Sequence, residues 1–206
     1  MDPVKEVCVE SFEEALRAVE AGASRIELCD NLTVGGTTPS YGTIKKCLEK
    51  LAVPFMVMIR PRGGNFIYSA DEFEIMQEDI LLCKELGVNG VVFGVLDENG
   101  NIDEERTRFL VQISKPMQIT FHKAIDVSQN ILDGVAFLKE IQVDRILSSG
   151  GRDTALQGAE ILNRMIELAA PQLTIVVAGK VTVLNFEEVR KRIPSGEYHG
   201  RRLVNF

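Results

Sequence analysis

Residues 55–64 read Phe55-Met56-Val57-Met58-Ile59-Arg60-Pro61-Arg62-Gly63-Gly64. The apolar start is typical of a buried strand, and it ends abruptly in two arginines, a proline and two glycines. Parallel α/β sheets build their sites at the carboxyl ends of strands, where arginine can bind carboxylate or phosphate in two-point geometry. The stretch therefore indicates a parallel α/β protein with an anion site at Arg60 and Arg62. A solvated turn with an ion pair is the alternative.

Short apolar runs of the same kind recur from end to end of the chain. We expect eight strands, at residues 4–10, 24–29, 54–60, 90–94, 117–122, 144–148, 173–178 and 197–199. Helical patterns follow the first seven, at residues 12–21, 41–51, 71–86, 103–114, 129–141, 154–170 and 184–193. Ser11 with Glu14 and Ser69 with Glu72 have the spacing of capping boxes at helix starts.

Eight strands alternating with helices are typical of parallel βαβ units. No linker or repeat interrupts them, so we predict a single domain over residues 1–206. The count favours a (β/α)8 TIM-type barrel, with a doubly wound open sheet as the alternative. Only residues 200–206 follow the eighth strand, so we expect a truncated or incomplete C-terminal closing helix.

Composition excludes several classes of protein. The chain has 206 residues, 45% of them hydrophobic, and a net charge of −7 without a basic stripe, which argues against nucleic-acid binding. No apolar run approaches the roughly 18–20 residues that cross a bilayer, and residues 1–6 lack a signal peptide's pattern, so we expect a cytoplasmic protein. Four dispersed cysteines indicate neither a zinc knuckle nor a disulfide scaffold, and no nucleotide cofactor is indicated.

Strand alternation places several polar side chains inside the predicted barrel. Turning Arg60 inward also turns Met56 and Met58 inward and sends Val57 and Ile59 out against the helices. The same test on the other strands adds more inward residues, namely Cys8, Glu10, Glu27, Cys29 and His122. Buried polar groups are costly unless they pair or bind something. We therefore predict a functional pocket, with a purely structural buried network as the alternative.

Two cysteines lie on sequential strands of that interior. Cys8 and Cys29 would be neighbours at about 4.8 Å strand spacing, and two thiolates so placed can hold Cu(I). The thioethers of Met56 or Met58 on the adjoining strand would suit the same ion. The alternative is that both cysteines are small packing residues.

Other strand ends carry candidate catalytic and anion-binding groups. His122 can act as acid or base near neutral pH, and Glu10 or Glu27 is its candidate partner. Ser149 and Gly150 follow the sixth strand and open a helix, which favours an anion there. The alternative is a plain tight βα turn, which would have the same sequence pattern. Ala178-Gly179-Lys180 follows the seventh strand, where barrels often bind phosphate.

Several motifs occur in a specific order along the chain: Glu6-Val7-Cys8-Val9, Arg25-Ile26-Glu27-Leu28-Cys29, Gly35-Gly36-Thr37-Thr38-Pro39-Ser40, Ile59-Arg60-Pro61-Arg62-Gly63-Gly64, Thr120-Phe121-His122-Lys123-Ala124 and Leu147-Ser148-Ser149-Gly150. In these motifs the chain resembles the CutC family of copper-homeostasis proteins. The similarity runs through about Gly158 and more loosely to His199-Gly200.

The resemblance implies a TIM-type barrel, a cytoplasmic location and a role in copper tolerance. In relatives, the cysteines that match Cys8 and Cys29 are the proposed Cu(I) ligands. This sequence has Lys123 where the family usually has arginine, and its turn after the seventh strand is reduced to Ala178-Gly179-Lys180-Val181. The chain also stops soon after Gly200, so we expect that barrel closure requires a partner subunit in a homo-oligomer.

Three functions remain open at this point. The first is a copper-homeostasis protein that binds Cu(I) through Cys8 and Cys29. The second is a barrel enzyme acting on a small anionic or phosphorylated metabolite, with any copper phenotype indirect. The third is a non-catalytic scaffold.

Overall fold

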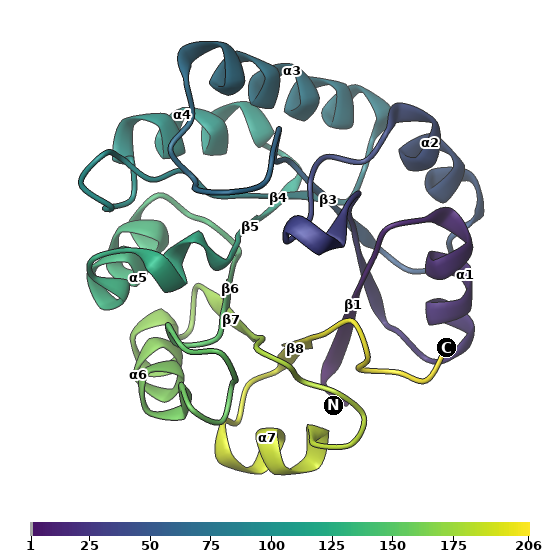
Figure 1. Cartoon of the computed structure of the whole chain (residues 1–206), viewed down its shortest axis with the longest axis vertical. Coiled ribbons are helices and arrows are strands. Elements are labelled where there is room, and N and C mark those ends of the chain that lie inside the picture. Colours follow the sequence, from purple (N-terminus) through teal and green to yellow (C-terminus); the bar gives the residue numbers. More distant parts are fainter. Residues whose placement is uncertain (1) are drawn as a thin grey trace.

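The computed structural model describes residues 2–206, which form a closed parallel barrel with strand order β1 to β8 (Figure 1). The strands are β1 Val4–Val9, β2 Arg25–Leu28, β3 Phe55–Met58, β4 Gly90–Phe93, β5 Gln118–Phe121, β6 Arg145–Ser148, β7 Thr174–Val177 and β8 Glu197–His199. The predicted TIM-type barrel is confirmed, and the open sheet is excluded because β1 pairs with β8.

Helices surround the barrel in an outer ring (Figure 1). They are α1 Phe12–Glu20, α2 Tyr41–Lys50, α3 Ala70–Leu86, α4 Glu104–Ser114, α5 Ile131–Glu140, α6 Ala159–Ala169 and α7 Phe186–Arg192, with short 3₁₀ helices η1 Leu32–Val34 and η2 Lys123–Val127. None of these helices is long and apolar enough to span a membrane.

The predicted capping boxes differ in outcome. Ser69 and Glu72 form a complete box at the start of α3. Ser11 accepts from the Glu14 N–H at the start of α1, but the Glu14 carboxylate accepts from the N–H of Glu10 instead of that of Ser11. The predicted box at Ser11 is therefore only half formed, because the Glu14 carboxylate reaches one residue further back.

Two apolar layers confirm the predicted strand alternation. Val57, Ile59 and Phe121 belong to the large cluster between barrel and helices. Met56 and Met58 instead belong to a small interior cluster that also contains Cys29. The barrel interior is thus only partly apolar, and polar side chains fill the rest.

We expected a truncated or incomplete closing helix, and residues 200–206 contain no helix. The expectation that closure requires a partner subunit is wrong, however. Lys5 and Tyr198 lie opposite each other in the β1–β8 pairing, and the strands close the barrel within one chain. The end of the chain is fixed by a bridge between Arg202 and Thr182 in the β7–α7 loop.

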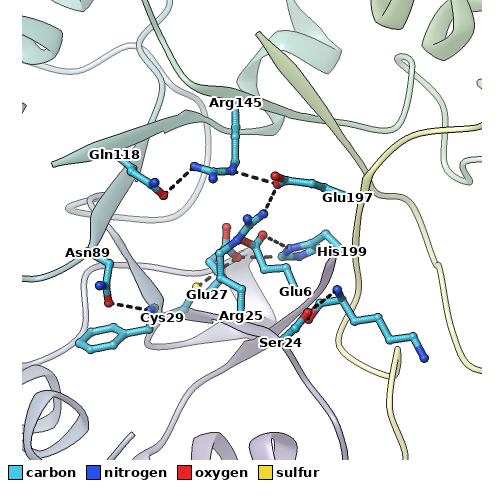
Figure 2. Close-up of polar contacts among 12 residues, drawn as sticks. Glu6, Ser24, Arg25, Glu27, Cys29, Asn89, Gln118, Arg145, Glu197 and His199 are labelled. Carbon is cyan, nitrogen blue, oxygen red and sulfur yellow. Dashed lines mark hydrogen bonds and ion pairs between the residues drawn. The ribbon is translucent and has the colours of Figure 1, made fainter. Parts of the chain in front are cut away.

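Charged side chains occupy the amino-terminal half of the barrel interior (Figure 2). Arg25 donates to Glu6 and to Glu197, and Arg145 donates through Nε to Glu197 at 2.9 Å. Arg145 also donates to Gln118 at 2.9 Å. Arg25 and Glu6 are 4% and 1% exposed, so neither charge is solvated by bulk water. Each carboxylate in this network is therefore neutralised by an arginine.

We expect Arg25→Met to lower the free energy of unfolding by about 3–5 kcal/mol, because it leaves Glu6 buried without its main counter-charge. Urea denaturation at neutral pH measures the change. Lys46→Ala is the control, since the Lys46–Glu49 pair is exposed on α2 and its loss should change stability little. Equal stability of wild type and Arg25→Met would contradict the structural role of the network.

Candidate functional site

A cavity of about 270 Å³ opens at the carboxyl ends of the strands. Its lining includes Cys8, Glu27, Met58, Arg60, His122 and His199. The 3₁₀ helix η1 lies over the barrel mouth (Figure 1). Ligand sites of parallel barrels occur at this end, so this cavity is the candidate site.

Three different donor groups converge at its base. The Cys8 sulfur, a Glu27 oxygen and a His199 nitrogen all lie within 4.8 Å of one another. Cys8 and Glu27 are opposite each other in the β1–β2 register, and His199 ends β8 on the other side of β1. The cluster therefore results from three neighbouring strands.

Glu6 fixes the orientation of His199 (Figure 2). His199 Nδ1 lies 2.8 Å from Glu6 Oε1, and Nε2 lies 3.8 Å from Glu27 Oε2. Burial alone would raise the pKa of Glu6, but the His199 hydrogen bond and the Arg25 charge outweigh it and lower this pKa to about 2. Glu6 is thus ionised and accepts the Nδ1 proton, which leaves Nε2 facing Cys8 and Glu27.

The surroundings raise the pKa of both His199 and Glu27. Burial alone would lower the pKa of His199, but Cys8 and the carboxylates of Glu27 and Glu6 raise it well above its ordinary value. Burial, reinforced by Glu6, also raises the pKa of Glu27, and the His199 charge only partly offsets this. The site can therefore hold or release protons at two adjacent groups.

His199 was not among the predicted site residues. The alternation of side chains along the last strand could have identified it, since Glu197 and His199 share the face opposite the buried Tyr198. Glu6 is 193 positions away in the sequence, so no local motif joins the two residues.

Cys29 lies apart from the cavity lining. It is buried with Met56, Met58 and Val92, and its Sγ donates to Glu27 Oε2 at 3.6 Å. Burial and the Glu27 carboxylate raise the pKa of its thiol well above the ordinary value. In the β1–β2 register Cys8 lies opposite Glu27, whereas Cys29 follows the last residue of β2.

Arg60 points inward as predicted, but its guanidinium holds loops together. Nη1 donates to the carbonyls of Val34 and Gly36 at 2.9 and 3.0 Å, and Nη2 donates to that of Gly64 at 2.8 Å. A Cβ at Gly63 would lie 2.7 Å from the Val34 side chain, so these loops pack closely. Arg60 thereby fixes the loop that covers the mouth, while its buried Nε has no partner.

Arg62 lies outside the lining of the cavity. Its guanidinium donates to both oxygens of Glu72 and to the carbonyls of Gly63, Asn65 and Ile67. These five bonds account for all five N–H groups of an arginine side chain. Arg62 therefore has no N–H group left to bind an anion, and the prediction that it does so is not supported.

Glu10 lies at the rim instead of the interior. Its carboxylate accepts from the N–H of Leu32 at 2.7 Å and from Arg201 at 3.2 Å. Glu10 thus anchors η1 and does not reach His122, which leaves Glu27 as the candidate carboxylate of the cavity.

Ser149 and Gly150 form a turn that the protein's own carboxylate fills. Asp126 accepts from the N–H groups of Ser149 and Gly151 and from the hydroxyls of Ser148 and Ser149. Lys123 pairs with the same carboxylate at 2.7 Å. The N–H of Gly150 donates instead to Ser148 Oγ at 2.9 Å. The donors that predicted an anion at this turn are therefore already used within the protein, by Asp126 and Ser148.

His122 carries a free donor into the cavity. Its Nδ1 accepts from the Ala124 N–H at 3.2 Å, so the ring hydrogen resides on Nε2, which is buried without a partner. The ring lies 4.8 Å from that of Phe66. Burial, together with the Arg60 charge, lowers the pKa of His122 to about 3. His122 is thus a neutral hydrogen-bond donor at physiological pH.

Comparisons with known proteins fit this geometry. A model of the CutC family matches residues 4–203. The chain belongs to the CutC family. It is 40% identical over 197 residues to a CutC family protein from Mesorhizobium japonicum, a match that covers 96% of this chain and 76% of that relative. It is 40% identical to the human copper homeostasis protein cutC homolog, over 94% of this chain and 71% of the relative.

A crystal structure supports the same assignment. The structure of a CutC protein from Streptococcus agalactiae superimposes with a TM-score of 0.93 at 35% identity, covering 98% of this chain and all of the other. The family resemblance predicted from the motifs is thereby confirmed.

The lowered pKa of His122 predicts a pH effect on stability. In the unfolded chain this histidine takes up a proton below its ordinary pKa of 6.5, whereas the folded chain keeps it neutral down to about pH 3. As pH falls from 6.5 to 5, wild type should therefore lose stability relative to His122→Asn, by up to about 1.4 kcal/mol per pH unit. Urea denaturation across this range measures the difference. Parallel curves for the two proteins would show that His122 does not titrate in this way.

Proposed function

We propose that this CutC family member acts in copper homeostasis by binding Cu(I) at Cys8 and His199. The observation that carries the proposal is the convergence of the Cys8 sulfur, the Glu27 carboxylate and the His199 imidazole within 4.8 Å at the base of the cavity. Thiolate is a soft ligand that selects Cu(I), and imidazole also suits copper. The cytoplasmic location expected from the sequence is part of this proposal.

The surroundings of the ligands support this choice. Metal-binding histidines usually donate their other ring N–H to a carboxylate, which is the relation of His199 to Glu6. The Met58 side chain lines the same cavity and offers a thioether. Glu27 is a harder ligand and is better suited to neutralising charge beside the metal. Cys29 is the second candidate sulfur, adjacent to Glu27 but buried away from the cavity.

We expect the wild type to bind about one Cu(I) per chain and Cys8→Ala to lose this binding. His199→Gln should weaken it at least tenfold, because the imidazole nitrogen is removed. Competition with a chromophoric Cu(I) chelator under anaerobic conditions measures both affinities. Cys47→Ala is the control, since Cys47 is buried on α2 outside the cavity.

Cys29→Ala separates two ligand sets. A large loss in this variant as well would favour the pair Cys8 and Cys29, whereas a small loss favours Cys8 with His199. Wild-type affinity in Cys8→Ala would exclude both sets.

A second candidate function is supported by separate atoms of the same cavity. Arg60 Nε, His122 Nε2 and Glu27 Oε1 are buried without a hydrogen-bond partner, which is costly unless a ligand completes them. The two N–H groups can donate to an oxygen of a small anionic compound, and Glu27 can exchange a proton with it. These are the features of a barrel enzyme acting on a small anionic metabolite.

Thermal-shift measurements with phosphorylated and carboxylated metabolites test this candidate. A compound that binds should raise the wild-type Tm by about 5–10 °C at a hundred times its Kd, and raise that of His122→Asn less. Cys47→Ala should respond like the wild type. A panel in which no anion stabilises the wild type would count against the enzyme.

A further inference from the structure

A second hollow of about 430 Å³ lies over the loops that follow β7 and β8. Its lining includes the cations Lys123, Lys180, Arg201 and Arg202 and one carboxylate, Asp153. Lys123, Arg201 and His199 also line the central cavity. The two spaces therefore adjoin at these three residues.

The charge of this hollow is opposite to that of the whole chain. The net charge is −7, yet four cations and a single acidic residue meet here. Arg201 is paired with Glu10 and Glu14 at 3.2 and 3.6 Å. Across residues 2–206, by contrast, neither Lys180 nor Arg202 forms an ion pair. Two positive charges are thus available to a ligand.

The loops that carry these charges are tied to each other. The Val183 N–H donates to the Arg202 carbonyl at 2.9 Å, and Asn185 donates to the Lys180 carbonyl at 3.0 Å. A Cβ at Gly200 would lie 2.1 Å from the Val181 carbonyl oxygen, so the two loops are in close contact. Lys180 itself has a φ of 55°, which is uncommon for a residue with a side chain. The residues that carry these cations therefore belong to two loops that are held together by a hydrogen bond and close packing.

The lysine and arginine side chains of this hollow are suited to binding phosphate. Lysine and arginine are the usual side chains for phosphate, and the loops after the seventh and eighth strands often bind phosphate in barrel enzymes. The turn after β6 is not an alternative phosphate site, because the N–H groups of Ser149 and Gly151 already donate to Asp126.

We propose that the hollow formed by Lys180, Arg201 and Arg202 binds a phosphoryl group, either as free phosphate or as the end of a small phosphate monoester. This inference rests on the second candidate function and names its substrate class. In a monoester, the organic part lies in the central cavity beside His122 and Glu27.

Isothermal titration with glycerol 3-phosphate, inorganic phosphate and glycerol at constant ionic strength tests the site. The wild type should bind both phosphates but not glycerol, and Lys180→Gln/Arg202→Gln should weaken phosphate binding at least tenfold. Arg190→Gln/Lys191→Gln is the matched control, since it removes the same charge from α7 outside the hollow. Tighter binding of glycerol 3-phosphate than of phosphate would identify a monoester, and equal binding would identify free phosphate.

Two results would overturn the inference: no phosphate binding by the wild type, or the same loss in the α7 control as in Lys180→Gln/Arg202→Gln. The Cu(I) affinity of Lys180→Gln/Arg202→Gln should equal that of the wild type. The copper site and the phosphoryl site can therefore fail independently.

Discussion

The buried pairing of Arg25 with Glu6 and Glu197 is the constraint on which the site depends. Barrel interiors are usually filled by branched aliphatic side chains, whereas this one carries a charged layer. Such a layer is stable only when every charge has a partner, since an unpaired buried ion costs several kcal/mol. The hydrogen bond from His199 and the charge of Arg25 together keep Glu6 ionised despite its burial, and Glu6 in turn orients His199 toward Cys8 and Glu27. The structural network and the candidate site therefore share a residue and cannot vary independently.

Much of the barrel could be predicted from the sequence because its rules are local. Alternation along β3 placed Met58 and Arg60 inside, and the order of strands and helices indicated closure. Long-range partners could not be predicted in the same way. The bonds from Arg60 to the carbonyl of Val34 and from the Ser149 N–H to the Asp126 carboxylate join separate loops, so no spacing in the sequence encodes them. Several side chains that were predicted to contact a ligand instead form hydrogen bonds to other parts of the protein.

Metal and organic ligand would use different faces of one cavity. Cys8 and His199 lie on β1 and β8, whereas the unpaired donors of Arg60 and His122 follow β3 and β5. Glu27 lies between these groups and belongs to both arrangements. Occupation by a cation at Cys8 would change the charge that Glu27 presents to an organic ligand. In the two proposed functions, copper binding and small-molecule binding would therefore be linked through the Glu27 carboxylate.

The Asp126 carboxylate in the β6 turn can be regarded as a ligand that the chain carries permanently. Tethering gives such a group an effective concentration in the millimolar range or above, whatever the composition of the cell. A free anion of ordinary affinity is thus shut out of the turn at all times. The turn after β6 thus has the shape of an anion-binding turn, but its anion is a side chain of the same protein. It links the loops after β5 and β6, and only the neighbouring loops remain open to ligands from solution.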